Sequence, residues 1–391
     1  MANSSSAVNF RSNYLQKVGL KRESVDANKS LDQILSEEPI DAGKLRQFAL
    51  QFQVPPAQRL RVWKLILGID SLFHNATAFV SEQCLQQSRM LWRSVRVMRQ
   101  CAPPPSGVAN NLTTNQHRRP TAEDLLEMFH IEEGAWVIVR ERQNSSDDMY
   151  QPFVQLAAAF LEICYSTNQS EEEAEHDWSD AYWLTKKLYG FLAGTDSSVG
   201  ISTGTSGISS NHEILWQKRA DVFDALVADT KRRLLARDEE LWLKLNARGC
   251  EWNLIAPLKM WYKTAFAAVF GAEVLPKLWN NVIGGSLCVL SYVAVELLIS
   301  IRSFLLDLLL ENGNQESISS DKKTTPLSTA DFSCSELLRV YLKRELSLDW
   351  QSSVIHKALK AWNGDGSQLM PKVQLAKTAT AAGKVPAVLN S

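Results

Sequence analysis

A helical period in the apolar residues constrains the fold of this chain more than any other feature of its sequence. After Pro55, for example, Leu60, Trp63 and Ile66 fall on one face of a helix, and Gly68 offers a stop. No stretch of the sequence shows the sustained alternation of apolar and polar residues that half-buried strands have. The sequence therefore predicts an all-α protein.

Apolar stripes also predict where the helices lie. A short one is expected after Ser30 and Gln33, which have the spacing of a capping box, and Pro39 ends it. Longer stripes predict helices at residues 43–53, 55–67, 79–100, 150–165, 178–192, 215–245, 258–270, 287–310 and 335–362. Because such stripes are the buried faces of ordinary globular helices, these positions are expected to form a core.

The segments between the predicted helices are rich in Ser, Thr, Gly, Asn and Pro, which is typical of flexible loops. They cover residues 102–120, 144–148, 166–177, 194–211 and 312–330. An acidic run, Glu171 to Glu173, is expected to be part of a solvated loop, since it lacks the glycine and ligand spacing of a calcium loop. The tail from Asn363 has few large apolar residues and is predicted to be disordered.

Residues 286–310 are apolar enough to suggest a membrane span. The polar side chains of Tyr292, Glu296 and Ser300, with Ser303 and Asp307, fall on one narrow stripe of this segment. A charge in the middle of a lone span would be costly, whereas a core helix with one edge at the solvent carries no such penalty. We therefore expect a core helix, and a membrane-anchored structural protein is the alternative, which carbonate extraction would test.

The composition argues against several classes of function. Lys and Arg number 42 and Asp and Glu 43, which leaves a net charge of -1 and no field that would attract nucleic acid or anionic lipid. The 6 cysteines are scattered, as in reduced cytosolic proteins, and residues 1–9 lack the apolar run of a secretion signal. Since the 6 histidines form no i, i+4 pair, no metal site is predicted, and the sequence also lacks a phosphate-binding loop, so no cofactor is predicted.

Four short motifs resemble the TBC domain, the helical fold that accelerates GTP hydrolysis on Rab-type GTPases. They occur in the order that the family has: the stretch 54–68, Asp-Ala-Tyr-Trp from Asp180, Trp-Tyr-Lys from Trp261, and Leu-Pro to Gly-Gly-Ser at 275–286. The positions that carry the resemblance are Pro55, Arg59, Val62, Trp63, Gly68, Asp180, Tyr182, Trp183, Trp261, Pro276, Trp279 and Gly285. The resemblance implies a fold of two helical lobes, with a TBC domain at 44–304. Residues 1–43 would form an N-terminal extension packed against it, 305–362 C-terminal helices and 363–391 the tail.

The residues that catalyse the reaction in active TBC domains are not recognisable here. Such domains supply an arginine from Ile-x-x-Asp-x-x-Arg, which neutralises charge on the transferred phosphoryl group, and a glutamine from Tyr-x-Gln, which positions the attacking water. Asp124 is the only aspartate between Asp70 and Asp147, and Glu127 follows it where the arginine would be. The pattern from Leu226 through Asp229 to Arg232 has nearly the right spacing but comes too late in the chain, and Tyr14-x-Gln16 too early.

Gln151 is the one candidate for the catalytic glutamine. It directly follows Tyr150, and Pro152 occupies the position of a family glycine. The resemblance therefore implies a TBC domain that binds rather than catalyses. An active GTPase-activating protein for a Rab, using Gln151 with Arg140 or Arg142, is the alternative.

The flanking segments resemble one branch of the family, whose members are subunits of the tuberous sclerosis complex. Examples are Asn-Phe-Arg-Ser at 9–12, Lys-Val-Gly at 17–19 and Lys-Ala-Leu-Lys-Ala-Trp at 357–362. That resemblance implies binding to the hamartin coiled coil and indirect association with tuberin, with Rheb or Rab GTPases as further partners. It also implies a cytoplasmic location, with peripheral recruitment to the lysosome or to cytoplasmic vesicles, and no membrane insertion.

Overall fold

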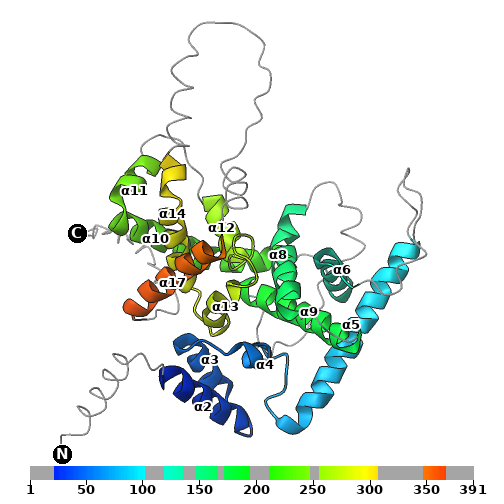
Figure 1. Ribbon diagram of the computed structural model, residues 1–391. Helices are drawn as coiled ribbons and strands as arrows, with labels where there is room; N and C mark the ends of the chain where they lie inside the picture. The colour runs from blue at the N-terminus through cyan, green and yellow to red at the C-terminus, as the bar shows by residue number, and fades with distance from the viewer. Residues whose placement is uncertain are drawn as a thin grey trace, which may run out of the picture.

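The computed structural model describes residues 22–101, 119–134, 147–165, 171–193, 211–246, 255–306 and 347–366. Every regular element in these ranges is helical, and no strand occurs among them. The all-α prediction is therefore confirmed. In Figure 1 the helices form a right-hand group of α5, α6, α8 and α9 and a left-hand group of α10 to α14 with α17, above α2 to α4.

The first three described helices are α2 (Arg22–Ser36), α3 (Ala42–Gln51) and α4 (Pro56–Ile66). Asp41 caps α3 by accepting hydrogen bonds from the amides of Gly43 and Lys44. Amides in the first turn of a helix have no backbone acceptor within the helix, so the cap satisfies them. Pro56 begins α4, where its missing N–H costs nothing. Helix α3 packs against α2 on one side and α4 on another, so these helices form one unit.

The right-hand group contains α5 (His74–Cys101), α6 (Ala122–Glu132), α8 (Asp147–Cys164) and α9 (Glu171–Ala193). Helix α5 packs on α6 and α9, and α8 packs on both α6 and α9. The rings of Phe129 in α6 and Phe153 in α8 stack with centroids 4.8 Å apart, and Tyr189 of α9 meets both edge-on. This aromatic cluster is the core of the group.

The left-hand group contains α10 (Asn211–Arg237), α11 (Glu239–Asn246), α12 (Ile255–Lys263), α13 (Leu275–Ile283), α14 (Val289–Ser300) and α17 (Leu348–Gly364). Helix α14 packs on α10 and α17, and α13 touches α3, α4, α14 and α17. Because α13 contacts helices from the beginning and the end of the chain, it lies at the junction between the left-hand group and the unit formed by α2 to α4 (Figure 1).

Several predicted boundaries were wrong. Ser30 caps no helix, because it lies inside α2, where Ala27, Leu31 and Leu35 continue one buried stripe past it. The acidic run at Glu171 begins α9 rather than forming a loop, which suits carboxylates because the N-terminal end of a helix favours negative charge. Helices α6 and α13 were not predicted at all.

Four further predictions need correction. The helix expected at 215–245 is two helices, since Asp238 interrupts it and accepts a hydrogen bond from the amide of Leu241. The helix expected at 258–270 ends at Lys263, because Ala265 and Phe266 adopt positive φ angles. Helix α17 begins at 348, and residues 335–346 lie outside the described ranges. It runs on to Gly364, so the tail predicted from Asn363 begins too early, and from 367 onward that prediction lies outside the described ranges too.

The apolar segment at 286–310 forms a core helix, α14, as predicted, but this helix is shorter than the one expected at 287–310, because it ends at Ser300 and Ile301 leaves the helical conformation. Its polar stripe reaches the solvent only toward the C-terminal end, where Ser300 and Ser303 are exposed. Tyr292 and Glu296 are buried, and Glu296 forms an ion pair with Arg237 of α10. Residues 307–310 are not among those described. Within the described part of the chain, no helix has the combination of length and hydropathy that a membrane-spanning segment requires.

Gly285, which follows the capping residue of α13, has a φ of 111°, a conformation that residues with a Cβ atom rarely adopt. We expect Gly285→Ala to lower the free energy of unfolding by about 1–2 kcal/mol through backbone strain. Gly364→Ala is the matched control, since its Cβ would meet no atom within 4 Å and its φ is ordinary. Urea unfolding followed by circular dichroism measures both, and equal losses would contradict the strain explanation.

Candidate functional site

The motif residues near Trp63 and Trp279 meet in the middle of the molecule. Trp63 of α4 donates its indole N–H to the side chain of Asn280 in α13 over 2.9 Å, across 217 residues of sequence. Trp279 donates to the carbonyl oxygen of Ala265, and its ring lies 4.5 Å from that of Phe160 in α8. These buried tryptophans therefore join three distant segments, which indicates a structural role.

The Asp-Ala-Tyr-Trp motif of α9 makes a second set of long-range contacts. Asp180 forms an ion pair with Lys64 of α4 at 2.9 Å, and Trp183 donates to the carbonyl oxygen of Cys84 in α5. Tyr182 donates to Glu132 at the end of α6, and burial together with that carboxylate raises the pKa of its hydroxyl. All of these groups are bonded within the fold, so none is placed to act on a substrate.

The remaining motif residues lie at helix ends or in the core. Pro55 precedes α4, Gly68 follows it with a φ of 68°, and Val62, Trp261 and Pro276 are buried. Arg59 is half-buried, and within the described ranges its Nε has no hydrogen-bond partner.

Asp124 and Glu127, the aspartate and the residue three positions after it that the sequence analysis singled out, both lie on α6. Asp124 is buried in a capping box with Thr121, and Glu127 lies one turn later. Arg99 of α5 binds both carboxylates: its Nη1 is 2.6 Å from Asp124 Oδ1 and its Nη2 is 2.9 Å from Glu127 Oε1. An arginine is therefore present beside Asp124, but it comes from another helix and is held by two carboxylates.

Gln151 lies in the first turns of α8, where its side chain is half-buried. Pro152 follows it inside the helix and is buried. The two arginines considered as its partners, Arg140 and Arg142, lie outside the described residues.

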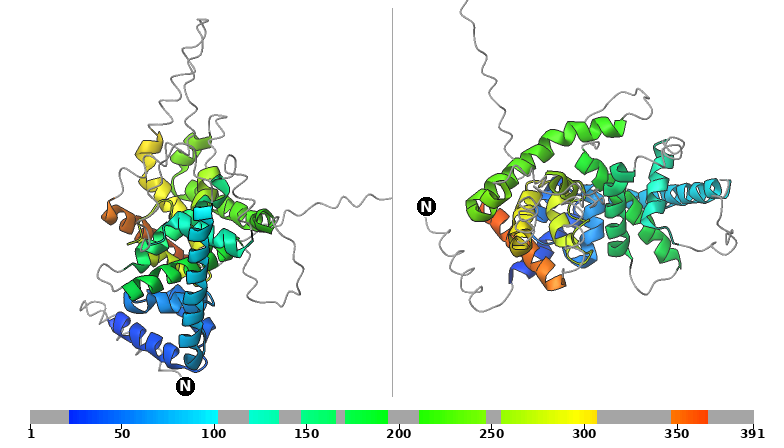
Figure 2. Two further views of the ribbon diagram at one scale, coloured as in Figure 1. Left: turned by 90° about the vertical axis from the view of Figure 1, so that its right-hand side faces the viewer. Right: turned by 90° about the horizontal axis from the view of Figure 1, so that it is seen from above.

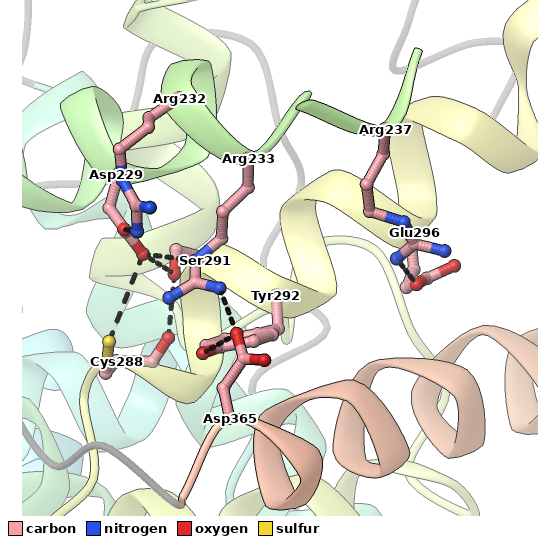
Figure 3. Close-up of polar contacts among 9 residues, drawn as sticks. All are labelled: Asp229, Arg232, Arg233, Arg237, Cys288, Ser291, Tyr292, Glu296 and Asp365. Carbon is pink, nitrogen blue, oxygen red and sulfur yellow. Dashed lines mark hydrogen bonds and ion pairs between the residues drawn. The ribbon is translucent and has the colours of Figure 1, made fainter. Parts of the chain in front are cut away.

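The late Asp-x-x-Arg pattern forms a structural cluster on α10 (Figure 3). Asp229 accepts hydrogen bonds from Arg232 at 2.5 Å, from Arg233 at 2.7 Å and from Ser291 of α14 at 2.7 Å. Arg233 also lies over the ring of Tyr292 at 3.7 Å. Partial burial raises the pKa of Asp229, but the hydrogen bonds from Arg233, Ser291 and Arg232 lower it overall.

Asp365 connects the end of α17 to this cluster. It accepts a hydrogen bond from Arg233 Nη1 at 2.7 Å and another from the Tyr292 hydroxyl at 2.8 Å, as Figure 3 shows. The hydrogen bond from Arg233, followed by that from Tyr292, lowers the pKa of its carboxyl group. The cluster therefore fixes α17 against α10 and α14.

Asp365→Asn is expected to destabilise the chain by about 0.5–1 kcal/mol at pH 7, since it weakens hydrogen bonds to a charged group that is half exposed and therefore screened by solvent. A carboxyl group whose pKa is lower in the folded chain stabilises it above the unfolded value of about 3.9 and loses that contribution as the pH falls further. The difference between the wild type and the variant should therefore shrink as the pH falls below about 4. Unfolding at several pH values measures it, with the exposed Glu273→Gln as the charge-matched control. A difference that persists at pH 2 would contradict this account.

One face of α5 carries exposed apolar side chains. Phe79, Met90 and Val97 are 67%, 70% and 50% exposed. Their separations of 11 and 7 residues place them within about 20° of one line along the helix, opposite the buried Ser88. Figure 2 shows that the C-terminal part of α5 projects beyond the helices on which it packs. We call Phe79, Met90 and Val97 the α5 line.

Sequence reasoning missed both Arg99 and the α5 line. The exposed apolar positions on α5 could have been found from their spacing, because they repeat on the side opposite the stripe that contains Leu85 and Val95. No sequence signal marks Arg99, since its partners come from another helix. In the described ranges, no group of three or more His, Cys, Asp or Glu side chains could hold a metal ion.

No family model matches the chain. It is similar to TBC1 domain family member 7 from Homo sapiens, with 26% identity over 294 residues that cover 75% of this chain and 82% of that protein. The Danio rerio protein of the same name is 26% identical over 292 residues. Among solved structures, the Ypt/Rab-GAP domain of Gyp1p superposes with a TM-score of 0.51 and 14% identity, covering 88% of this chain and 99% of that domain. The predicted TBC fold is therefore confirmed, as is the likeness to TBC1 domain family member 7.

Proposed function

We propose that this chain, which has the Rab-GAP TBC fold, is a non-catalytic subunit that binds the hamartin coiled coil and stabilises the tuberous sclerosis complex. In this proposal tuberin carries the GTPase-activating chemistry toward Rheb, which restrains TOR complex 1 signalling. Residues 44–304 form the TBC domain between the N-terminal extension and the C-terminal helices. The chain acts in the cytoplasm, with recruitment to the lysosome or cytoplasmic vesicles through its partners.

The observation that carries the proposal is the α5 line. An exposed apolar row that runs along one side of a projecting helix suits a partner that is itself a long helix. From Phe79 to Val97 the row is about 27 Å long, or about five helical turns. A coiled coil offers apolar positions over such a length, whereas a compact pocket does not.

The state of Arg99 supports a non-catalytic role. A catalytic arginine must leave its resting contacts and reach the transferred phosphoryl group, and such a residue can be worth about 10³–10⁵ in rate. Arg99 would have to give up two carboxylates, one of which is buried. If Glu127 takes the place of the family arginine, the motif offers a carboxylate held by Arg99 rather than a cation that could stabilise charge on the phosphoryl group.

The second candidate is an active GTPase-activating protein for a Rab. The overall likeness to the Ypt/Rab-GAP domain of Gyp1p favours it. It would use Gln151 at the beginning of α8, with an arginine from outside the described residues, such as Arg140 or Arg142.

A calorimetric titration with the C-terminal coiled coil of hamartin tests the proposal. Saturable binding with a Kd of about 1 μM or tighter is expected, and absence of both heat and co-elution would contradict it. A turnover assay over a panel of Rab proteins tests the alternative. We expect no stimulation of GTP hydrolysis, and stimulation that disappears in Gln151→Ala would favour the active enzyme.

A further inference from the structure

A groove lies between α2 and α3, which pack side by side at the N-terminal end of the described chain (Figure 1). It has a volume of about 320 Å³ and is partly open to solvent. Gln33 and Ile34 line it from α2, and Gln47, Phe48, Gln51 and Phe52 line it from α3 and its end. An ion pair between Glu37 and Lys44, at 2.7 Å, closes the end near the turn between the helices.

The groove offers two kinds of contact. Phe52 is 42% exposed and its ring lies 5.2 Å from that of the buried Phe48, so the exposed aromatic surface of the groove comes from Phe52. The amides of Gln33, Gln47 and Gln51 can each donate and accept hydrogen bonds, and none of them is bonded to another described side chain or backbone group. Such a lining suits a segment that brings apolar side chains together with main-chain N–H and C=O groups of its own.

We infer that this groove binds the N-terminal segment of the same chain, residues 1–21, through Phe10, Tyr14 and Val18. These three side chains recur at every fourth residue in a segment that is otherwise mostly polar. In the groove they would bring apolar side chains to the exposed surface of Ile34 and Phe52.

The covalent connection of residues 1–21 to α2 makes them a more favourable ligand for the groove than a separate molecule. Residue 22 begins α2, which is itself one wall of the groove. The far end of the groove, at Glu37, is about 22 Å along the helix from there, a distance that about seven extended residues span. The segment has enough length to turn back and lie in the groove. Because its binding is intramolecular, it avoids the translational entropy that a second molecule would lose.

Photochemical cross-linking in the full chain tests the inference. Phe52 is replaced by benzoylphenylalanine, the protein is irradiated, and the adducts are identified by mass spectrometry after digestion. We expect adducts with residues 1–21 in protein that migrates as a monomer. The same probe at Phe79, which is also exposed but lies on α5, is the control and should give none with that segment.

A double substitution, Phe10→Ser with Tyr14→Ser, tests the chemistry of the contact. We expect the yield of the adduct to fall at least about tenfold, since burial of even one aromatic side chain shifts an equilibrium by that order. Adducts that join two copies of the chain would overturn the inference. So would the absence of adducts, adducts confined to other segments, or a yield that the double substitution leaves unchanged.

Discussion

Met90→Glu is expected to weaken binding of the hamartin coiled coil by about 100-fold or more, while the stability of the chain stays within about 0.5 kcal/mol of the wild type. Met90 is the middle residue of the α5 line and the most exposed of the three. In an apolar interface the new carboxylate would be desolvated without a partner, which costs several times more than a lost contact. In the free chain it is solvated, so folding is unaffected. Calorimetric titration and urea unfolding measure the two effects separately.

Leu243→Glu on α11 is the matched control, because it places the same charge at an apolar residue that is 54% exposed but lies outside the α5 line. It should leave binding unchanged. Phe79→Ser should weaken binding to a lesser degree than Met90→Glu, since it removes apolar area without burying a charge. If the coiled coil binds Met90→Glu as tightly as the wild type, the α5 line is not the docking surface, whatever the partner.

Helix boundaries were predicted correctly where the residues at the boundary are compatible with a helix end but not with the interior of a helix. Pro55 and Gly68 enclose α4, and both kinds of residue are strong signals at those positions. Ser30 and Thr121 show where the same kind of signal is ambiguous. Both begin a Ser/Thr-x-x-acceptor pattern, but only Thr121 caps a helix, in a box with Asp124. Pro120 keeps a helix from continuing upstream of Thr121, whereas Ala27 extends the apolar stripe upstream of Ser30.

The break between α10 and α11 was predictable but was missed. Asp238, Glu239 and Glu240 put three carboxylates at one point of a long helical pattern, which favours a new N-terminus there. Arg302, which follows α14, binds both Asp238 and Glu240 and so stabilises the junction from the outside. That contact joins residues more than sixty positions apart, so no local sequence pattern predicts it.

For the candidate site, too, the sequence predicted the local patterns but not the contacts between distant residues. The motif positions could be recognised from sequence because each is a short local pattern. What they do depends on pairings such as Lys64 with Asp180 and Arg99 with Glu127, which arise only when the helices pack. The sequence indicated that an arginine was missing beside Asp124, but it could not indicate that one from α5 would be bound there by two carboxylates.

Trp63→Ala should lower the free energy of unfolding by roughly 3–5 kcal/mol, the largest loss expected from any substitution considered for this chain. The side chain is fully buried, and its ring lies 6.1 Å from that of Phe160 and 6.2 Å from that of Trp279. Its removal leaves a cavity where three segments meet and deprives the buried Asn280 of a hydrogen-bond donor. Since domains have only about 5–15 kcal/mol of stability, this loss is a large fraction of the total.

Trp63→Phe keeps an aromatic ring and removes chiefly the hydrogen bond, so it should cost less, about 1–2 kcal/mol. A double-mutant cycle with Asn280→Ala separates the hydrogen bond from the packing, and we expect a coupling of about 1 kcal/mol between the two positions. Urea unfolding followed by far-UV circular dichroism is the measurement, because tryptophan fluorescence changes with the substitution itself. A loss for Trp63→Ala no larger than that for the exposed Phe79→Ala would show that α4, α8 and α13 are not held together at this point.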